Sequence, residues 1–375
     1  MTAQVPRALA DAIARNGSIP FDQFVDLALY DDHDGFFASG GGAGRDRGDF
    51  ITSPEVGPLF GAVVARWIDE QWRAIGEPDP FVVIEAGAGR GALALAVRAA
   101  APACSAAMRY VLVERSTAWR ARQGEHLALV HPFEVLGPDG EPDESVPAAV
   151  AGSGPVFCSL SDLPLQRVDG VVIANELLDN VAFRLAQRAA DSWSELRVGV
   201  DDTGPAWIRV PLAPADGVRL DRLAPGTAEG AVVPLQDGAA AWIDRARSAL
   251  RRGAVLAIDY ADTTASLARR PAEEWLRTYR DHERGTDPLS DLGVQDITCE
   301  VATDQLPGGF AATTQQAWLA RWGIDELVDE GRLRWAERAG VGDLEALRAR
   351  SRIVEAEALT DPAGLGGFTV MEWRV

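Results

Sequence analysis

The clearest apolar pattern in the chain is a series of short, β-branched runs separated by helical stretches. Each run has the length of a buried strand, and alternating strands and helices are typical of an α/β fold with a parallel sheet. The runs cover residues 81–85, 110–113, 156–160, 170–174 and 254–260. We therefore expect a central α/β core that begins at Phe81.

The segments around this core predict additions to it. Residues 5–30 predict two short helices, and residues 40–48 form a glycine-rich loop that could act as a lid. A helical apolar stripe follows Pro54 and stops at Gly76. We expect an N-terminal helical cap with this loop over 1–76, and a second domain over 77–375. Its expected insertions are a β-rich segment over about 181–235 and a polar segment over about 261–305.

The strand at residues 81–85 runs directly into three alternate glycines. Glu85 is followed by Gly87, Gly89 and Gly91, and a helical stretch begins at once. A glycine turn between a strand and a helix N-terminus is where α/β folds bind nucleotide-like ligands. Glu114 ends the next strand, where an acid can accept the hydroxyls of a ribose. This pair of signals predicts an adenosine-containing ligand.

Two adenosine ligands fit the glycine turn, and Glu85 distinguishes them. Gly-x-Gly-x-x-Ala from Gly87 also matches the dinucleotide fingerprint of NAD enzymes. A carboxylate at position 85 would repel a pyrophosphate but could face the ammonium of a methionine moiety. We therefore favour S-adenosyl-L-methionine over NAD, with a solvated acid at the strand end as the plain alternative for Glu85. A final strand at 368–374, with no helix after it, also suits a class I methyltransferase sheet better than a dehydrogenase.

Composition narrows the classes of partner. The net charge of −20 argues against nucleic acid, because no basic stripe is present to neutralise phosphates. The three cysteines are far apart and the four histidines are scattered, so we expect no disulfide framework and no metal site. No apolar run is long enough to cross a membrane, and we expect a cytoplasmic protein.

Several motifs together resemble the MidA-like methyltransferases, which include the mitochondrial complex I assembly factor. The motifs are Gly-Asp-Phe-Ile-Thr-Ser-Pro-Glu at 48–55, Glu-Ala-Gly-Ala-Gly-Arg-Gly at 85–91, Asn-Glu-Leu-Leu-Asp at 175–179, Ile-Asp-Tyr at 258–260, Leu-Arg-Thr-Tyr-Arg at 276–280 and Thr-Thr-Gln-Gln at 313–316. The resemblance spans nearly the whole chain in order. It implies a class I fold, S-adenosylmethionine, and methyl transfer to a protein arginine, for example in a respiratory-complex subunit. A homo-oligomer is compatible with it. Ala88 stands where the family usually has proline, and Glu274 and Trp275 stand where it usually has glycine.

Candidate acceptor residues follow the strand at 170–174. Glu176 is our first choice for the carboxylate that binds the guanidinium of the substrate arginine, and Asp179 is the second. Asn175 could bond to the cofactor or the substrate. Such a strand tip lies at the carboxyl edge of the sheet, where ligands bind. The plain alternative is that Asn175 caps the next helix and Asp179 makes a structural salt bridge.

A second polar cluster precedes the core. Asp49, Thr52, Ser53 and Glu55 could close over the cofactor, or Thr52 or Ser53 could simply cap a helix whose dipole favours Glu55. Asp162, after the third strand, is a candidate for contacting the adenine amino group.

These observations predict a class I methyltransferase of Rossmann-like α/β fold with an antiparallel terminal strand, an N-terminal helical cap and inserted segments. The predicted activity is methylation of arginine in a protein substrate. Two alternatives stay open: an NAD-dependent oxidoreductase, and an assembly factor that binds the cofactor without turnover.

Overall fold

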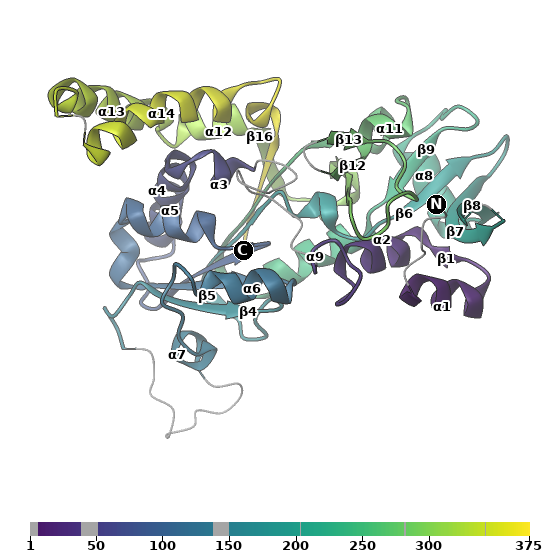
Figure 1. Cartoon of the computed structure of the whole chain (residues 1–375), viewed down its shortest axis with the longest axis horizontal. Helices are drawn as coiled ribbons and strands as arrows, with labels where there is room; N and C mark the ends of the chain where they lie inside the picture. Colours follow the sequence, from purple (N-terminus) through teal and green to yellow (C-terminus); the bar gives the residue numbers. More distant parts are fainter. Residues whose placement is uncertain (1–6, 39–51, 138–149, 203, 281–282, 342) are drawn as a thin grey trace. The chain divides into compact units, whose positions relative to one another are not determined.

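The computed structural model describes residues 7–38, 52–137, 150–202, 204–280, 283–341 and 343–375 (Figure 1). By their packing, the residues divide into two units. The sheet unit comprises residues 51–177, 245–259 and 309–375, and the insertion unit comprises residues 1–50, 178–244 and 260–308. Because packing units need not coincide with domains, the division expected after residue 76 stays a prediction.

The sheet unit is built on a seven-stranded sheet. Its strand order is β16 (Phe310–Thr314), β17 (Thr369–Arg374), β10 (Leu250–Asp259), β5 (Val168–Asn175), β2 (Phe81–Ala86), β3 (Met108–Val113) and β4 (Val156–Leu160). The five strands from β10 to β4 pair in parallel, and β17 pairs antiparallel with both β10 and β16. The five expected core strands and the antiparallel terminal strand are thereby confirmed.

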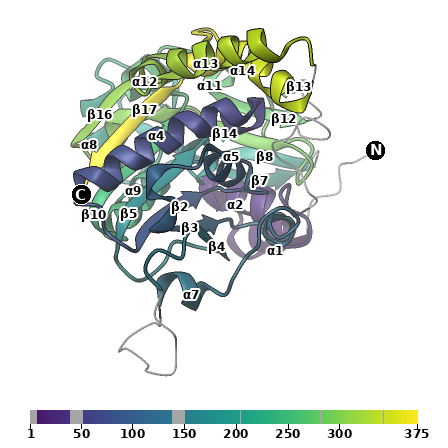
Figure 2. The same ribbon diagram turned by 90° about the vertical axis from the view of Figure 1, so that its left-hand side faces the viewer.

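Helices cover both faces of a parallel sheet, so its strands must be apolar on both sides. Every residue of β2 and of β3 is buried. The helices α4 (Pro58–Ala74) and α5 (Ala92–Ala100) pack together over one face (Figure 2). A Cβ at Gly61 of α4 would lie 2.3 Å from the Cβ of Ala96. Glycine at this position therefore permits the close approach of the two helices. The other helices of this unit are α3 (Ser53–Val56), α6 (Thr117–Gln123), α7 (Pro132–Leu136), α12 (Gln315–Arg321), α13 (Ile324–Arg338) and α14 (Leu344–Thr360), and the short 3₁₀ turns are Ala103–Ala106 and Leu365–Gly367.

The helix expected after Pro54 is interrupted. It consists of α3 and α4, which are separated by Gly57. The side chain of Glu355 from α14 lies where a Cβ at Gly57 would be, and its Oε2 accepts the Leu59 N–H at 2.9 Å. This carboxylate therefore satisfies an N–H in the first turn of α4, which side chains from elsewhere commonly do at helix starts.

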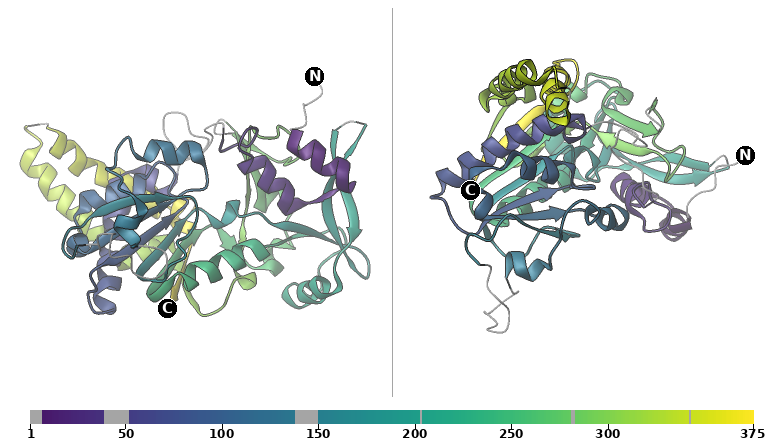
Figure 3. Two further views of the ribbon diagram at one scale, coloured as in Figure 1. Left: turned by 90° about the horizontal axis from the view of Figure 1, so that it is seen from below. Right: turned by 60° about the vertical axis from the view of Figure 1, so that its left-hand side comes forward.

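The insertion unit contains the expected β-rich segment. A sheet of β1 (Ile19–Pro20), β7 (Trp193–Asp201), β6 (Arg184–Arg188) and β9 (Val232–Leu235) has β8 (Gly204–Pro211) paired to β7. The expected pair of N-terminal helices, α1 (Arg7–Asn16) and α2 (Phe21–Tyr30), packs against β7 (Figure 3). One helix, α8 (Pro214–Leu223), was not expected from the sequence.

The polar segment after residue 260 also has structure of its own. It forms β12 (Leu276–Arg280) between β13 (Glu283–Gly285) and β14 (Asp296–Cys299), and the short pair β11 (Ala261–Asp262) and β15 (Val301–Ala302). Its helical turns are α10 (Thr264–Leu267), α11 (Ala272–Trp275) and Thr303–Gln305. The insertion unit also contains the turn Leu178–Asn180, and α9 (Asp237–Ser248) begins in this unit and ends in the sheet unit.

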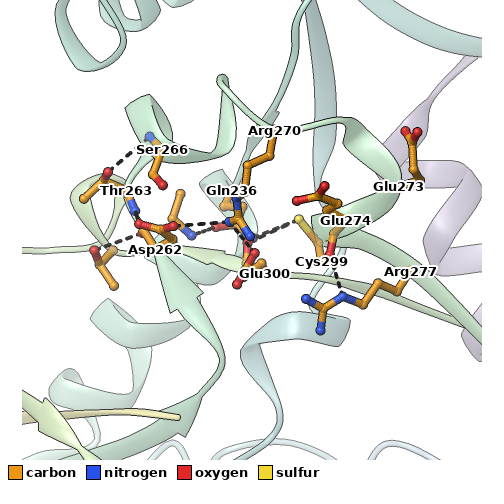
Figure 4. A network of polar contacts seen from close by, with 12 residues as sticks. Gln236, Asp262, Thr263, Ser266, Arg270, Glu273, Glu274, Arg277, Cys299 and Glu300 are labelled. Carbon is orange, nitrogen blue, oxygen red and sulfur yellow. Dashed lines mark hydrogen bonds and ion pairs between the residues drawn. The ribbon is translucent and has the colours of Figure 1, made fainter. Parts of the chain in front are cut away.

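A buried amide fastens β9 to the strands of this segment (Figure 4). Gln236 donates through Nε2 to the carbonyl of Glu300 at 3.2 Å and accepts the Ala302 N–H through Oε1 at 2.6 Å. The guanidinium of Arg270 binds Glu300 at 2.5 Å and Asp262 at 3.2 Å. A buried amide such as that of Gln236, which is bonded through both its nitrogen and its oxygen, favours one arrangement of the strands.

Candidate functional site

The three predicted glycines form the turn between β2 and α5. Their φ angles are +70° at Gly87, +50° at Gly89 and +86° at Gly91. A Cβ at Gly91 would meet Leu112 at 3.0 Å, whereas one at Gly89 would have nothing within 4 Å. Gly89 is therefore required by its backbone conformation and adjoins open space. This place, at the carboxyl edge of parallel strands, is where ligands of such sheets bind.

Two side chains hold the backbone of Gly89 in place. Glu114 accepts the Gly89 N–H through Oε2 at 2.9 Å and the Ser116 N–H through Oε1 at 2.7 Å, while Gln123 donates through Nε2 to the Gly89 carbonyl at 2.8 Å. Burial raises the pKa of Glu114. The structure thus brings Glu114 to the glycine turn. Sequence reasoning missed Gln123, because a glutamine at the end of a helix carries no signal for a contact 34 residues away.

Glu85 lies inside the sheet rather than at a solvated strand end. Its exposed fraction is 5%, and its Oε2 accepts the phenol of Tyr110 at 2.7 Å. Burial raises the pKa of Glu85 to about 8, despite the hydrogen bonds that Tyr110 and the Ala94 N–H give to it. The alternative of a solvated acid is therefore wrong. A role of Glu85 toward the ammonium of a ligand stays a prediction.

The raised pKa of Glu85 has a consequence for stability. Between the ordinary pKa of 4.5 and about 8, the folded protein keeps a proton on Glu85 that the unfolded chain releases. Unfolding free energy should therefore fall as pH rises through this window, by up to about 1.4 kcal/mol per pH unit. Glu85→Gln should weaken this pH dependence, because an amide does not titrate. Urea midpoints of both proteins from pH 5 to 8 measure it, and parallel curves would contradict the proton on Glu85.

The segment that includes Thr52, Ser53 and Glu55 makes contacts other than helix capping. Thr52 precedes α3 but makes no side-chain cap hydrogen bond. The buried hydroxyl of Ser53 donates to Gln315 at 3.1 Å, and Glu55 binds Arg90 of the glycine turn. Capping by Thr52 or Ser53 side chains is therefore wrong for α3, and the segment is tied to the glycine turn instead. Asp49 lies outside the described residues.

The tip of β5 carries a residue in a rare conformation. Glu176 has a φ of +50°, a region that L-residues other than asparagine and aspartate seldom occupy. Its Oε1 accepts the Ser53 N–H and the Nδ2 of Asn175, both at 3.0 Å, and its own N–H donates to the Ile258 carbonyl at 2.8 Å. Asn175 therefore orients a carboxylate rather than capping a helix. Such backbone strain is common at functional sites.

Asp179 belongs to the insertion unit and is buried there. Its carboxylate accepts the phenol of Tyr260, and the guanidinium of Arg277 lies over the Tyr260 ring, 5.2 Å from its centroid. Burial raises the pKa of Asp179, and the charge of Arg277 partly offsets this. The main partner of Asp179 is thus a tyrosine hydroxyl. The resemblance gave Ile-Asp-Tyr and Leu-Arg-Thr-Tyr-Arg as motifs, but no residue pattern could have paired these side chains.

Asp162 lies at the exposed end of β4. It binds Arg245 at 2.5 Å and helps to line a cavity of about 240 Å³ between α7 and the loop after β4. Phe133 and Leu163 are also in its lining. This position is compatible with a base at the end of the sheet, and contact of Asp162 with an adenine stays a prediction.

Neither a metal centre nor a membrane helix is found where the structure is described. No group of three or more histidine, cysteine, aspartate or glutamate side chains in these ranges could hold a metal ion. Among the same residues, no helix combines the length and the apolar character needed to cross a membrane.

Comparison with known proteins identifies relatives of the chain. The model of a family described as "Putative S-adenosyl-L-methionine-dependent methyltransferase" matches residues 63–318. A solved structure of a protein from Burkholderia thailandensis, bound to S-adenosyl-homocysteine, is 28% identical with a TM-score of 0.78, and the match covers 100% of this chain and 95% of that one. The predictions of fold, family and S-adenosylmethionine as cofactor are confirmed.

Two curated relatives carry a more specific name. The mitochondrial protein arginine methyltransferase NDUFAF7 homolog of Drosophila melanogaster is 28% identical over 198 residues, which are 52% of this chain and 44% of that protein. The NDUFAF7 protein of Danio rerio is 25% identical over 341 residues, 84% of this chain and 76% of its own. The chain thus spans about half the length of the fly protein.

Proposed function

The chain belongs to the family of S-adenosylmethionine-dependent methyltransferases, and from this premise we propose that it methylates an arginine side chain of a protein. Relatives named as protein arginine methyltransferases support the choice of acceptor. A strand tip that presents a carboxylate supports it independently, because carboxylates grip the guanidinium fork.

The residues at the glycine turn fit the cofactor. S-adenosylmethionine supplies, when bound, a methyl group on a positively charged sulfur. Asn175 Oδ1 and Gln123 Oε1 are buried acceptors that, within the described residues, have no hydrogen-bond partner. Because buried acceptors normally find a donor, they suit the ammonium and hydroxyl groups of this ligand. Glu114 and Gln123 hold the Gly89 backbone against it.

Glu176 is the residue on which the acceptor proposal rests. Its carboxylate is oriented by the Ser53 N–H and by Asn175 before any substrate binds. It pairs with the substrate guanidinium and aims one nitrogen at the methyl carbon. That nitrogen forms the new N–C bond and releases one proton to solvent, while the electrons of the broken C–S bond remain on sulfur. A preorganised carboxylate stabilises the cationic reacting group without reorganising during the reaction.

One experiment separates this function from the remaining alternative, an assembly factor that binds the cofactor without turnover. Calorimetric titration with S-adenosylmethionine is followed by transfer of labelled methyl groups into cell proteins, with the labelled residue identified by mass spectrometry. Label on arginine supports the proposal. Label on lysine or on a small molecule would overturn the acceptor. Cofactor binding without any transfer would favour an assembly factor.

Glu114→Ala should weaken the binding of S-adenosyl-homocysteine. The variant loses a carboxylate that fixes Gly89 and that we expect to accept ribose hydroxyls, so the expected cost is about 1.5–3 kcal/mol of binding free energy. Calorimetry measures the change. Glu125→Gln on the surface is the control, and an unchanged dissociation constant for Glu114→Ala would place the ribose contact elsewhere.

The finer predictions on partners and location are part of this proposal. A respiratory-complex subunit as the substrate follows from the family resemblance. A homo-oligomer is compatible with the resemblance, and a cytoplasmic location is expected from the sequence; sedimentation and cell fractionation test them.

A further inference from the structure

The short helix α3 is bonded to the glycine turn by a fork of two hydrogen bonds. Arg90 donates through Nε to Glu55 Oε1 at 3.2 Å and through Nη2 to Glu55 Oε2 at 2.6 Å. The Glu55 side chain is 9% exposed and that of Arg90 is 33% exposed. A bidentate, partly buried pair of this kind fixes geometry as well as adding attraction. Arg90 is the residue between Gly89 and Gly91. The pair of hydrogen bonds therefore restrains the glycine turn at residues 87–91, which we call the cofactor loop.

The same helix is bonded at its first residue to the acceptor carboxylate. The Ser53 N–H donates to Glu176 Oε1 at 3.0 Å. Ser53 and Glu55 are two residues apart in a helix of four residues, so any displacement of one displaces the other. Helix α3 therefore connects the cofactor loop, which follows β2, to Glu176, which follows β5.

Helix α3 is also hydrogen-bonded, through Ser53, to the C-terminal part of the chain. The hydroxyl of Ser53 donates to Gln315 Oε1 at 3.1 Å, and Gln315 Nε2 donates to the Leu359 carbonyl at 3.2 Å. Ser53 and Gln315 are fully buried. The helix is thus fixed by backbone and side-chain bonds to segments far away in the sequence. Simple helix capping does not require the fork between Glu55 and Arg90.

We propose that Glu55 is a positioning residue, which holds the cofactor loop through Arg90 and couples its position to Glu176 through α3. This inference rests on the proposed function for the role of Glu176, but the effect of Glu55 on the cofactor loop does not. Glu55 acts through Arg90 and α3 and touches no reacting atom. Binding of cofactor and orientation of the acceptor carboxylate therefore depend on the same four residues.

Binding of S-adenosyl-homocysteine tests the cofactor side without any need for turnover. Glu55→Gln and Arg90→Gln should each raise its dissociation constant about tenfold, because each breaks the charged fork. The double variant should be no weaker than either single variant, because the same bond is lost only once. Glu326→Gln is the matched control, since it breaks a salt bridge of 2.8 Å to Arg66 on the surface of the same unit.

The thermal midpoints of all four variants distinguish positioning from folding. We expect Glu55→Gln and Glu326→Gln to melt at similar temperatures although only the first loses affinity. A dissociation constant within twofold of wild type for Glu55→Gln would overturn the proposal. Effects that add in the double variant would also overturn it, because Glu55 and Arg90 would then act separately.

The acceptor side is tested at the Ser53 N–H. Proline is tolerated at the first position of a helix, and Thr52 before it is already extended with a ψ of 165°, so Ser53→Pro removes this donor without breaking α3. Ser53→Ala removes the hydroxyl and keeps the donor. We expect kcat of Ser53→Pro to be about tenfold below that of Ser53→Ala, with equal dissociation constants for S-adenosyl-homocysteine.

Failure of the inference and failure of the proposed function give different results. Equal kcat values for the two Ser53 variants would remove the link to Glu176 while methyl transfer itself persists. Absence of methyl transfer in wild type would refute the proposed function. The affinities of the Glu55 and Arg90 variants would still decide whether the fork positions the cofactor loop.

Discussion

Glu176→Gln is expected to lower methyl transfer about 100-fold, in line with the loss of a main electrostatic contact in the reacting geometry. The glutamine keeps an Oε1 that can accept the Ser53 N–H and the amide of Asn175, so the strand tip should retain its shape. Because this shape is retained, affinity for S-adenosyl-homocysteine should stay within about twofold of wild type. Methyl transfer should fall because the negative charge that pairs with a guanidinium is lost. Transfer of labelled methyl groups and calorimetry measure the two quantities.

The control for this variant lies at the other end of the same strand. Asp169→Asn removes a carboxylate that binds Arg252 at 2.7 Å near the start of β5, far from the strand tip. Its turnover should equal that of wild type. If Glu176→Gln were also fully active, Glu176 would not bind the acceptor, and Asp179 would become the leading candidate.

Gly89→Val is expected to abolish measurable binding of S-adenosyl-homocysteine. A β-branched residue at a φ of +50° is strained, and the loop can relieve the strain by leaving this conformation. Binding would then have to restore both the strain and the bonds to Glu114 and Gln123. Together these cost about 3–5 kcal/mol, or a factor of 10² or more in the dissociation constant. The new side chain would also enter the open space beside the loop.

A second glycine separates loss of binding from loss of folding. Gly76 has a φ of +88°, and a Cβ there would also meet nothing within 4 Å, but it follows α4 at the surface. Gly76→Val should lower the thermal midpoint about as much as Gly89→Val and leave binding intact. Tight binding by Gly89→Val would show that the ligand does not approach this turn.

The fold could be predicted from the sequence wherever one segment determines its own structure. The run 156–160 coincides with β4, and the terminal run 368–374 differs from β17 by one residue, because a short run rich in β-branched and aromatic residues indicates a strand by itself. The interruption at Gly57 has a local signal, because Pro58 follows it and a residue before proline tends to leave the helical conformation. The bond from the Leu59 N–H to Glu355 joins residues 296 positions apart and has no such signal. In α8 the sequence Pro-Ala-Asp-Gly reads as a turn, although its proline stands in the first turn of a helix.

In the candidate site, too, features that one segment determines could be predicted, whereas contacts between distant segments could not. The glycine turn and Glu114 are recognisable because each follows a strand at a fixed spacing. The burial of Glu85 follows from its place in a fully buried strand, but its bond to Tyr110 depends on the register of β2 and β3. The bonds from Ser53 to Glu176 and from Glu55 to Arg90 join residues 123 and 35 positions apart. Nothing in the local pattern of either segment indicates such contacts.

The strand order of the sheet has a consequence for how the protein is made. The central strand β5 ends at residue 175, but its neighbour β10 begins at residue 250, and β17 follows only at residue 369. At about 5–20 residues per second, a ribosome leaves the apolar edge of β5 without its partner for several seconds. An open edge of this kind is a template for aggregation between nascent chains. We therefore expect newly synthesised chains to need a chaperone until β10 has emerged, and co-expression of a chaperone to raise the yield of folded protein.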